Sequence, residues 1–215
     1  MCGILGVKVQ NKDEGTINFI KSLMLELRIR GTHSLGVAYS LANSIELERI
    51  FGAGGIGINW FVEGFKTSEA DTLIFHSRYS TSGNHEVMEN NQPIIVGRTA
   101  IAMNGILTQA TKQVYEKQYS VQCNSANDAE IFLRKLIMDG VDIPEFVKAN
   151  PLCSFAGVYL VGGHLYAFRN NKRPLYYGEY KNCKYFTSTI DVIARAGGDL
   201  NNVEIVPPFE EKLCE

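Results

Sequence analysis

The sequence lacks a long apolar run and a strong excess of charge of either sign. No run of about 18 apolar residues occurs, which excludes a membrane-spanning helix. The N-terminal apolar stretch is also too short for a signal peptide. The net charge is −2, with 21 basic and 23 acidic residues, so no global field attracts nucleic acid or an anionic membrane. We therefore expect a cytoplasmic protein that binds neither.

Cysteine and histidine are few and scattered. The five cysteines form no C-x-x-C pair and the four histidines add no ligand spacing, so we expect no metal site. An odd number of cysteines without a framework spacing fits a reducing compartment, where thiols stay free.

One cysteine, Cys2, stands directly behind Met1. Removal of Met1, which is usual before a small second residue, would give Cys2 both a thiol and a free α-amine. Their reference pKa values are about 8.5 and about 7.7–8.0, so the amine can act as base for the thiol. The alternative interpretation is a small apolar residue that opens a strand.

Alternating and periodic apolar positions predict a single domain over residues 1–215. The expected strands are 4–9, 35–41, 45–51, 72–76, 94–96, 99–103, 154–161, 164–168, 175–179, 184–187 and 203–206. The expected helices are 17–29, 108–118, a helix after Ser125 that ends before Gly140, and 190–196. Strands, then helices, then strands indicate an α+β fold in which helices cover antiparallel sheets.

Several short signals predict where these elements begin and end. Thr16 is the expected N-cap of the first helix. Ser125 with Asp128 three residues later is a start similar to a capping box. The pair Asn104-Gly105 is a turn signal at the end of the 99–103 strand.

The segment Gly52–Gly57 formally satisfies G-x-G-x-x-G, a pattern of dinucleotide-binding proteins. That pattern requires a helix directly after the loop and alternating parallel strands around it. The sequence predicts neither, so we expect a glycine-rich loop and no cofactor. A dinucleotide-binding module remains one alternative function.

Seven segments follow one another in an order that is known from one protein family. They are C-G-I-L-G at 2–6, R-G-T-H-S-L-G at 30–36, H-S-R-Y-S-T-S-G at 76–83, N-Q-P at 91–93, N-G at 104–105, N-D-A-E at 127–130 and R-N-N-K-R-P-L-Y-Y-G at 169–178. Together they resemble the class II glutamine amidotransferases, which are N-terminal nucleophile hydrolases. The variants at Tyr79 and Ser82 are closer to the glutaminase domain of amidophosphoribosyltransferases than to that of glucosamine-6-phosphate synthases.

Three positions depart from the family pattern. His33 stands where the family usually has Asp, Met103 where it has His before Asn-Gly, and Lys172 where it has Gly. None of these is the implied nucleophile or base.

The resemblance implies a four-layer αββα sandwich of two antiparallel sheets. It also implies an enzyme that hydrolyses the side-chain amide of glutamine to glutamate and ammonia. Cys2 would be the nucleophile, with its own α-amine as base. The Asn104 side chain and the Gly105 N–H would hold the oxyanion.

The family pattern also assigns residues to the zwitterionic end of glutamine. Arg78, helped by Thr81, would hold the α-carboxylate, and Asp128 would pair with the α-ammonium. Tyr79 would pack beside them. Arg30 would support the loop near Cys2.

The resemblance implies no metal and no organic cofactor. Family members usually carry a synthetase domain, and none is recognised in this sequence, so we expect a separate synthetase partner that accepts the ammonia. Two further alternatives are an amidase acting on another γ-glutamyl or small-molecule amide without an ammonia acceptor, and a non-catalytic regulator that binds glutamine or a partner protein.

Overall fold

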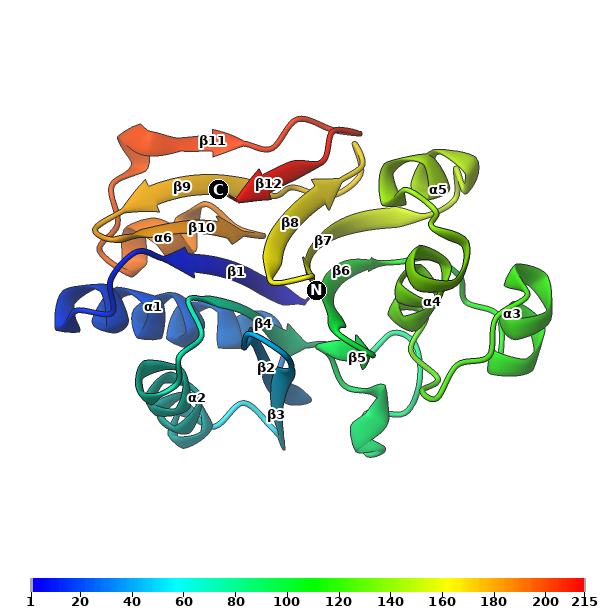
Figure 1. Cartoon of the computed structure of the whole chain (residues 1–215), viewed down its shortest axis with the longest axis horizontal. Helices are drawn as coiled ribbons and strands as arrows, with labels where there is room; N and C mark the ends of the chain where they lie inside the picture. The colour runs from blue at the N-terminus through cyan, green and yellow to red at the C-terminus, as the bar shows by residue number, and fades with distance from the viewer. Residues whose placement is uncertain (1, 215) are drawn as a thin grey trace.

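The computed structural model describes residues 2–214, which form two stacked antiparallel sheets with helices on both outer sides (Figure 1). The first sheet has seven strands in the order β11-β9-β10-β1-β4-β2-β3. The second has five, in the order β12-β8-β7-β6-β5. The expected αββα sandwich is therefore confirmed.

The strands are β1 (Gly3–Val9), β2 (Ser34–Ser40), β3 (Ile45–Phe51), β4 (Thr72–Arg78), β5 (Ile94–Val96), β6 (Thr99–Ile106), β7 (Ser154–Val161), β8 (His164–Arg169), β9 (Tyr176–Tyr180), β10 (Cys183–Thr187), β11 (Val203–Ile205) and β12 (Lys212–Cys214). The α-helices are α1 (Glu14–Leu27), α2 (Gly55–Thr67), α3 (Lys112–Tyr119), α4 (Ala129–Asp139), α5 (Ile143–Ala149) and α6 (Asp191–Arg195). Short 3-10 helices are η1 (Arg28–Arg30), η2 (Met88–Asn90) and η3 (Leu200–Asn202).

Three apolar layers correspond to the three interfaces of the sandwich. One lies between the seven-stranded sheet and helices α1, α2 and α6, and includes Leu23 and Phe61. The middle layer joins the two sheets through small side chains such as Ala102 and Ala156. The third packs α3, α4 and α5 against the five-stranded sheet around Phe132. Small residues in the middle layer allow the two sheets to approach closely.

Strand β1 lies in the centre of its sheet, between β10 and β4. Its first residue, Gly3, pairs with Ser77 near the end of β4. Strands β1 and β4 also contact β6 of the second sheet. Cys2, the residue before β1, is thereby placed where both sheets meet.

The first helix begins earlier than the sequence predicted. Asp13, not Thr16, is the N-cap, because its carboxylate accepts a hydrogen bond of 2.9 Å from the Thr16 N–H. Thr16 is fully buried in the first turn. An aspartate N-cap also favours the helix through the dipole.

The expectation that no helix follows the glycine-rich segment was wrong. Helix α2 begins at Gly55. Ile58, Phe61 and Phe65 of this helix recur at helical spacing. The glycines around them have a low helix propensity and therefore favoured the prediction of a loop. The preceding strand β3 is an edge strand that pairs antiparallel with β2, so the segment is not the first turn of a parallel βαβ unit.

The predicted turn at Asn104-Gly105 was also wrong. Both residues lie within β6 and pair with Ala156 and Phe155 of β7. This long-range pairing overrides the local turn preference. Helix α5 and strand β12 had no sequence prediction, and α4 begins after Asp128 rather than at Ser125.

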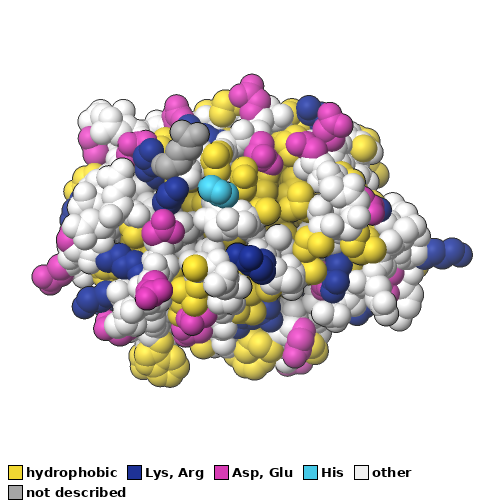
Figure 2. Space-filling model, viewed as in Figure 1, with side chains coloured by type: hydrophobic (Ala, Val, Ile, Leu, Met, Phe, Trp, Pro, Cys, Tyr) yellow, Lys and Arg dark blue, Asp and Glu magenta, His cyan; other side chains and the backbone are white. Residues whose placement is uncertain are grey.

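The surface carries both charge signs without a dominant patch on the face in Figure 2, where Lys and Arg alternate with Asp and Glu. Within residues 2–214, no helix is both long enough and apolar enough to span a bilayer.

The close approach of strand β7 requires a glycine at position 105. A Cβ atom there would lie 1.9 Å from the backbone oxygen of Ser154. We expect Gly105→Ala to lower the free energy of unfolding by about 1–3 kcal/mol, since a backbone atom must move. Gly54→Ala is the matched control, because nothing lies within 4 Å of its Cβ. Urea unfolding measures both, and equal midpoints for the two variants would contradict the prediction.

Candidate active site

Cys2 is half-buried directly before the start of β1. Its Sγ lies 3.4 Å from both the backbone N and the backbone O of Tyr79. Its carbonyl oxygen accepts a hydrogen bond of 3.3 Å from Nε of Arg30, the supporting residue expected from the sequence. Met1, whose removal is predicted, lies outside the described residues.

The environment of Cys2 keeps its thiol protonated at neutral pH. Burial raises the pKa of Cys2, while the Tyr79 backbone contact and the charges of Arg78 and Arg30 lower it less strongly. A thiol with a raised pKa needs a nearby base to become a nucleophile.

Arg78 ends β4 and is only 2% exposed. Its two Nη atoms donate hydrogen bonds to the Asn91 side chain and to the backbone oxygens of Ser82 and Gly83. Burial lowers the pKa of Arg78 to about 10, while Cys2 and Asp128 act in the opposite direction. Arg78 therefore stays cationic at neutral pH.

Asp128 precedes α4 and is equally buried. Its Oδ2 accepts hydrogen bonds from the N–H groups of Leu107 (2.7 Å) and Thr108 (3.1 Å), and its Oδ1 accepts one of 2.9 Å from Ser82 Oγ. Burial raises the pKa of Asp128, and these hydrogen bonds oppose the shift. The carboxylate thus joins the chain just after β6 to the loop after β4.

Ser82 connects the buried cation to the buried anion. Its carbonyl oxygen accepts from Arg78 and its hydroxyl donates to Asp128. No role in the site was predicted for Ser82 from the sequence, although it lies inside the 76–83 segment that resembles the family.

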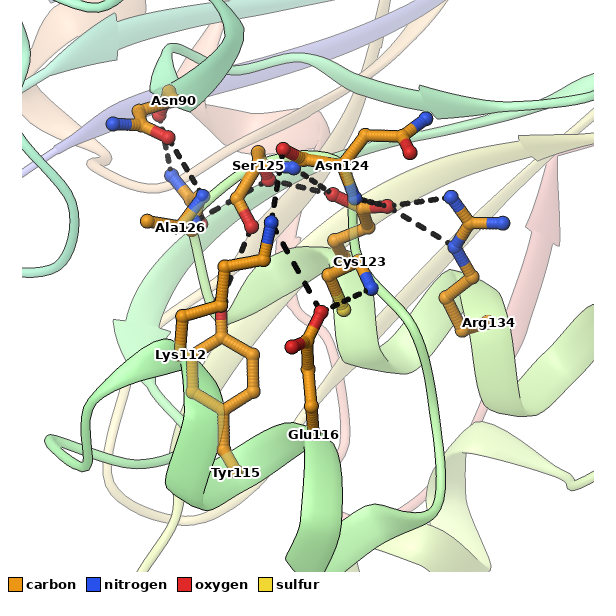
Figure 3. Close-up of polar contacts among 11 residues, drawn as sticks. Asn90, Lys112, Tyr115, Glu116, Cys123, Asn124, Ser125, Ala126 and Arg134 are labelled. Atoms are coloured by element: carbon orange, nitrogen blue, oxygen red, sulfur yellow. Dashed lines mark hydrogen bonds and ion pairs between the residues drawn. The ribbon is translucent and has the colours of Figure 1, made fainter.

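The segment before Asp128 is fixed from several sides. In Figure 3, Lys112, Tyr115 and Glu116 point from α3 toward residues 123–126, while Asn90 approaches Ala126 from another direction. Glu116 accepts from the Cys123 N–H (2.7 Å), and Asn90 Oδ1 accepts from the Ala126 N–H (2.7 Å). These contacts hold the segment 123–126, which leads to Asp128.

Asn104 on β6 is 2% exposed, and its Nδ2 has no hydrogen-bond partner among residues 2–214. Two side chains contact the backbone of the preceding residue, Met103. The Met103 N–H donates to Gln92 Oε1 (2.6 Å), and Met103 O lies 3.2 Å from Nε2 of His76. Burial lowers the pKa of His76 to about 3, so its ring is neutral. A buried amide donor without a partner is costly, which makes it a candidate for contact with a ligand.

The remaining predicted residues lie on the loop after β4. The Tyr79 side chain is 50% exposed and stacks on His33, and Thr81 is exposed. In the part of the chain that the structure describes, potential metal-ligating side chains form no group of three or more.

The chain was compared with protein families and with curated proteins. No family model matches it. The chain is 27% identical over 180 residues to an amidophosphoribosyltransferase from Methanothermobacter thermautotrophicus, a match that covers 79% of this chain and 37% of the relative. The chain therefore spans little more than a third of that relative.

Solved structures give the stronger match. The structure titled as the allosteric regulatory enzyme of purine biosynthesis superposes with a TM-score of 0.71 at 19% identity, over 99% of this chain and 46% of that one. Glutamine phosphoribosylpyrophosphate amidotransferase from B. subtilis gives 0.68 at 14%, over 97% and 49%. A class-II glutamine aminotransferase domain protein from Silicibacter pomeroyi gives 0.54 at 14%, over 87% and 88%. The chain has the fold of a class II glutamine amidotransferase domain. The resemblance read from the sequence is thereby confirmed.

Within this amidotransferase fold, hydrogen bonds connect most of the predicted site residues. Arg30 and Tyr79 contact Cys2 directly, and Ser82 joins Arg78 to Asp128. Asn104 and Gly105 lie on β6, a strand that contacts β1 and β4.

Proposed function

We propose that this protein is a glutaminase that hydrolyses the side-chain amide of glutamine with Cys2 as the N-terminal nucleophile. The fold supports an amidotransferase-type reaction in general. The choice of glutamine rests on the charges next to Cys2.

The arrangement of Arg78 and Asp128 around Ser82 carries the proposal. Ser82 presents an oxygen acceptor to the guanidinium and a hydroxyl donor to the carboxylate. The α-carboxylate and α-ammonium of glutamine have the same pattern of acceptor and donor. A buried cation and a buried anion, linked through one residue of the loop that touches Cys2, suit a zwitterionic head group.

The reaction then follows from the groups around Cys2. Its sulfur attacks the amide carbon while the α-amine takes the thiol proton. The amine returns that proton to the leaving nitrogen, so ammonia departs and a thioester remains. Water adds to the thioester, and glutamate and the free thiol are released.

The tetrahedral intermediates carry a negative oxygen that needs donors. The unpartnered Nδ2 of Asn104 and the N–H of Gly105 fill that role in our proposal. Donors that are fixed before the reaction stabilise the transition state without reorganisation.

We also propose that residues 1–215 act as one glutaminase domain in the cytoplasm, with a separate synthetase as ammonia acceptor. The five free cysteines suit a reducing compartment. The relatives found are transferases by name, which supports transfer of the amide nitrogen to a second substrate. A partner that binds near Cys2 should change the rate of glutamine hydrolysis.

Glutamate release by the full chain tests this function. We expect hydrolysis of glutamine and none of asparagine, because one methylene fewer moves the amide away from Cys2 when the head group is bound. Faster release from a larger γ-glutamyl amide than from glutamine would favour the amidase alternative. Absence of release from every such amide would overturn the proposal.

Asp128→Asn should raise KM for glutamine by about 10–100-fold, since a charged hydrogen bond to the ammonium is lost while the side-chain volume is kept. Asp139→Asn is the matched control at the exposed end of the same helix. Steady-state kinetics give both values, and an unchanged KM in Asp128→Asn would remove Asp128 from the binding site.

A further inference from the structure

Three aromatic rings form a stack beside the Cys2 site. His33 lies between Tyr79 and His85, with ring centroids 5.0 Å from Tyr79 and 4.2 Å from His85. The planes are inclined by 21° and 19°. One edge of the stack faces an open groove of about 470 Å³ lined by Thr32, His33, Phe51, Gly52, His85 and Glu86. Solvent protons therefore reach the imidazoles.

His33 also holds the chain on both sides of Tyr79. Its Nδ1 accepts a hydrogen bond of 3.0 Å from the Ser80 N–H. Its own backbone N–H donates to the Arg78 carbonyl oxygen at 3.0 Å. Tyr79, between these two anchors, is the residue whose backbone contacts Cys2 Sγ.

The hydrogen bond to Ser80 requires a neutral imidazole. Nδ1 is the acceptor, so the proton of the neutral ring is on Nε2. In the imidazolium form both nitrogens are donors, and Nδ1–H would point at the Ser80 N–H. Protonation of His33 therefore breaks this anchor.

Burial and two basic neighbours favour the neutral form of the His33 ring. Arg78 faces it from the end of β4 and His85 from the loop after β4. The Tyr79 ring stacks on it, and Glu86 lines the same groove. Burial, then His85 and Arg78, lower the pKa of His33 from its usual 6.5. The neutral ring is thus present above that lowered value and is lost as the pH falls through it.

We propose that His33 is a positioning residue for the Cys2 site and couples its assembly to pH. The neutral ring fixes Tyr79 and Ser80, and thereby the backbone against which the Cys2 sulfur lies. Acidification breaks the hydrogen bond to Ser80 and releases this loop. The kinetic consequence of this inference rests on the proposed glutaminase function. The structural part, in which His33 holds the loop, does not depend on that function.

The structural part is tested on the unmodified full chain by NMR. The Ser80 amide shift should titrate with the same midpoint as the His33 ring, below 6.5. In His33→Asn, whose Oδ1 can accept the same hydrogen bond but does not titrate, the Ser80 shift should stay constant between about pH 5 and pH 8. In His85→Phe, which keeps a stacked ring without charge, the His33 midpoint should rise. A Ser80 amide shift that stays constant while the His33 ring titrates would overturn the proposal.

The kinetic part is tested by the pH profile of kcat/KM for glutamine. In the unmodified protein, the plot of log kcat/KM against pH should reach a slope of about two on its acid side, because the Cys2 amine and His33 must both be deprotonated. His33→Asn should reduce the slope to about one, with a similar plateau. His33→Phe keeps the ring but not the acceptor, and should lower kcat/KM roughly tenfold above the pH at which His33 is protonated, with a smaller difference below it.

His164→Asn, on an exposed histidine of β8, is the matched control and should leave the profile unchanged. An unchanged slope in His33→Asn, or unchanged activity in His33→Phe, would overturn the positioning role. If glutamine is not hydrolysed at all, the proposed function fails, while the NMR titration still decides whether His33 holds the loop.

Discussion

Replacing Cys2 with alanine is expected to lower kcat for glutamate release by a factor on the order of 10⁴–10⁶, the range typical of a lost nucleophile. No other group near the amide carbon can take over the attack in our proposal. Steady-state measurement of glutamate formation at saturating glutamine gives the factor directly.

The fold should survive this substitution. Apart from the hydrogen bond that Arg30 makes to its backbone, Cys2 contacts the Tyr79 backbone through its sulfur, and both interactions lie at the start of β1. Cys214→Ala, in β12 at the far edge of the second sheet, is the matched control and should keep its activity. Comparable losses in both variants would mean that Cys2 acts through stability and not as the nucleophile.

Replacing Asn104 with leucine is expected to lower kcat by about 10²–10³, equivalent to about 2.7–4 kcal/mol of transition-state stabilisation. KM should change little, because the donor is needed only when negative charge develops on the oxygen. Steady-state kinetics separate the two parameters.

The same substitution should not destabilise the free protein. Among residues 2–214 the buried Nδ2 of Asn104 has no hydrogen-bond partner, so leucine, of similar volume, removes an uncompensated polar group. Asn127→Leu is the matched control, because the Asn127 side chain donates to Asn90 O (2.8 Å) and accepts from the Ala129 N–H (3.0 Å). Urea unfolding should show a loss of stability in Asn127→Leu only. A similar loss in Asn104→Leu would indicate a structural role for Asn104.

The contrast between these two asparagines follows from how functional sites depart from ordinary packing. Buried polar groups in proteins are almost always hydrogen-bonded. Asn127 follows this rule and fixes the start of α4, whereas Asn104 does not. We attribute the difference to the bound state, in which the substrate oxygen would complete the hydrogen bonding of Asn104.

Much of the sheet framework was predictable because its strands carry strong local patterns. The hairpin of β7 and β8, with Gly162-Gly163 between them, follows from apolar strands and a glycine turn, and β2 and β3 were likewise located within a residue or so. Errors arose where tertiary contacts override local preference. Asn104-Gly105 became part of a strand because β7 pairs with it.

The residues of the candidate site were predicted from residue types in family order, but the hydrogen bonds that connect them were not. The loop after β4 determines these connections. Its conformation lets Ser82 bridge Arg78 and Asp128, and it brings the Tyr79 backbone into contact with the Cys2 sulfur. His33 departs from the family residue at its position, and its stack with Tyr79 and His85 joins the loop before β2 to the loop after β4. Sequence spacing carries no information about such contacts.

The central claim is that the thiol of an N-terminal Cys2 attacks the glutamine amide. Peptide mass spectrometry after incubation of the full chain with a diazoketone analogue of glutamine tests it most directly, since the attacking thiol displaces dinitrogen and keeps the glutamine skeleton. We predict a single adduct on Cys2, in a peptide that begins at Cys2 without Met1, and protection by free glutamine. An adduct on another cysteine, or a modified Cys2 that still follows Met1, would contradict the mechanism.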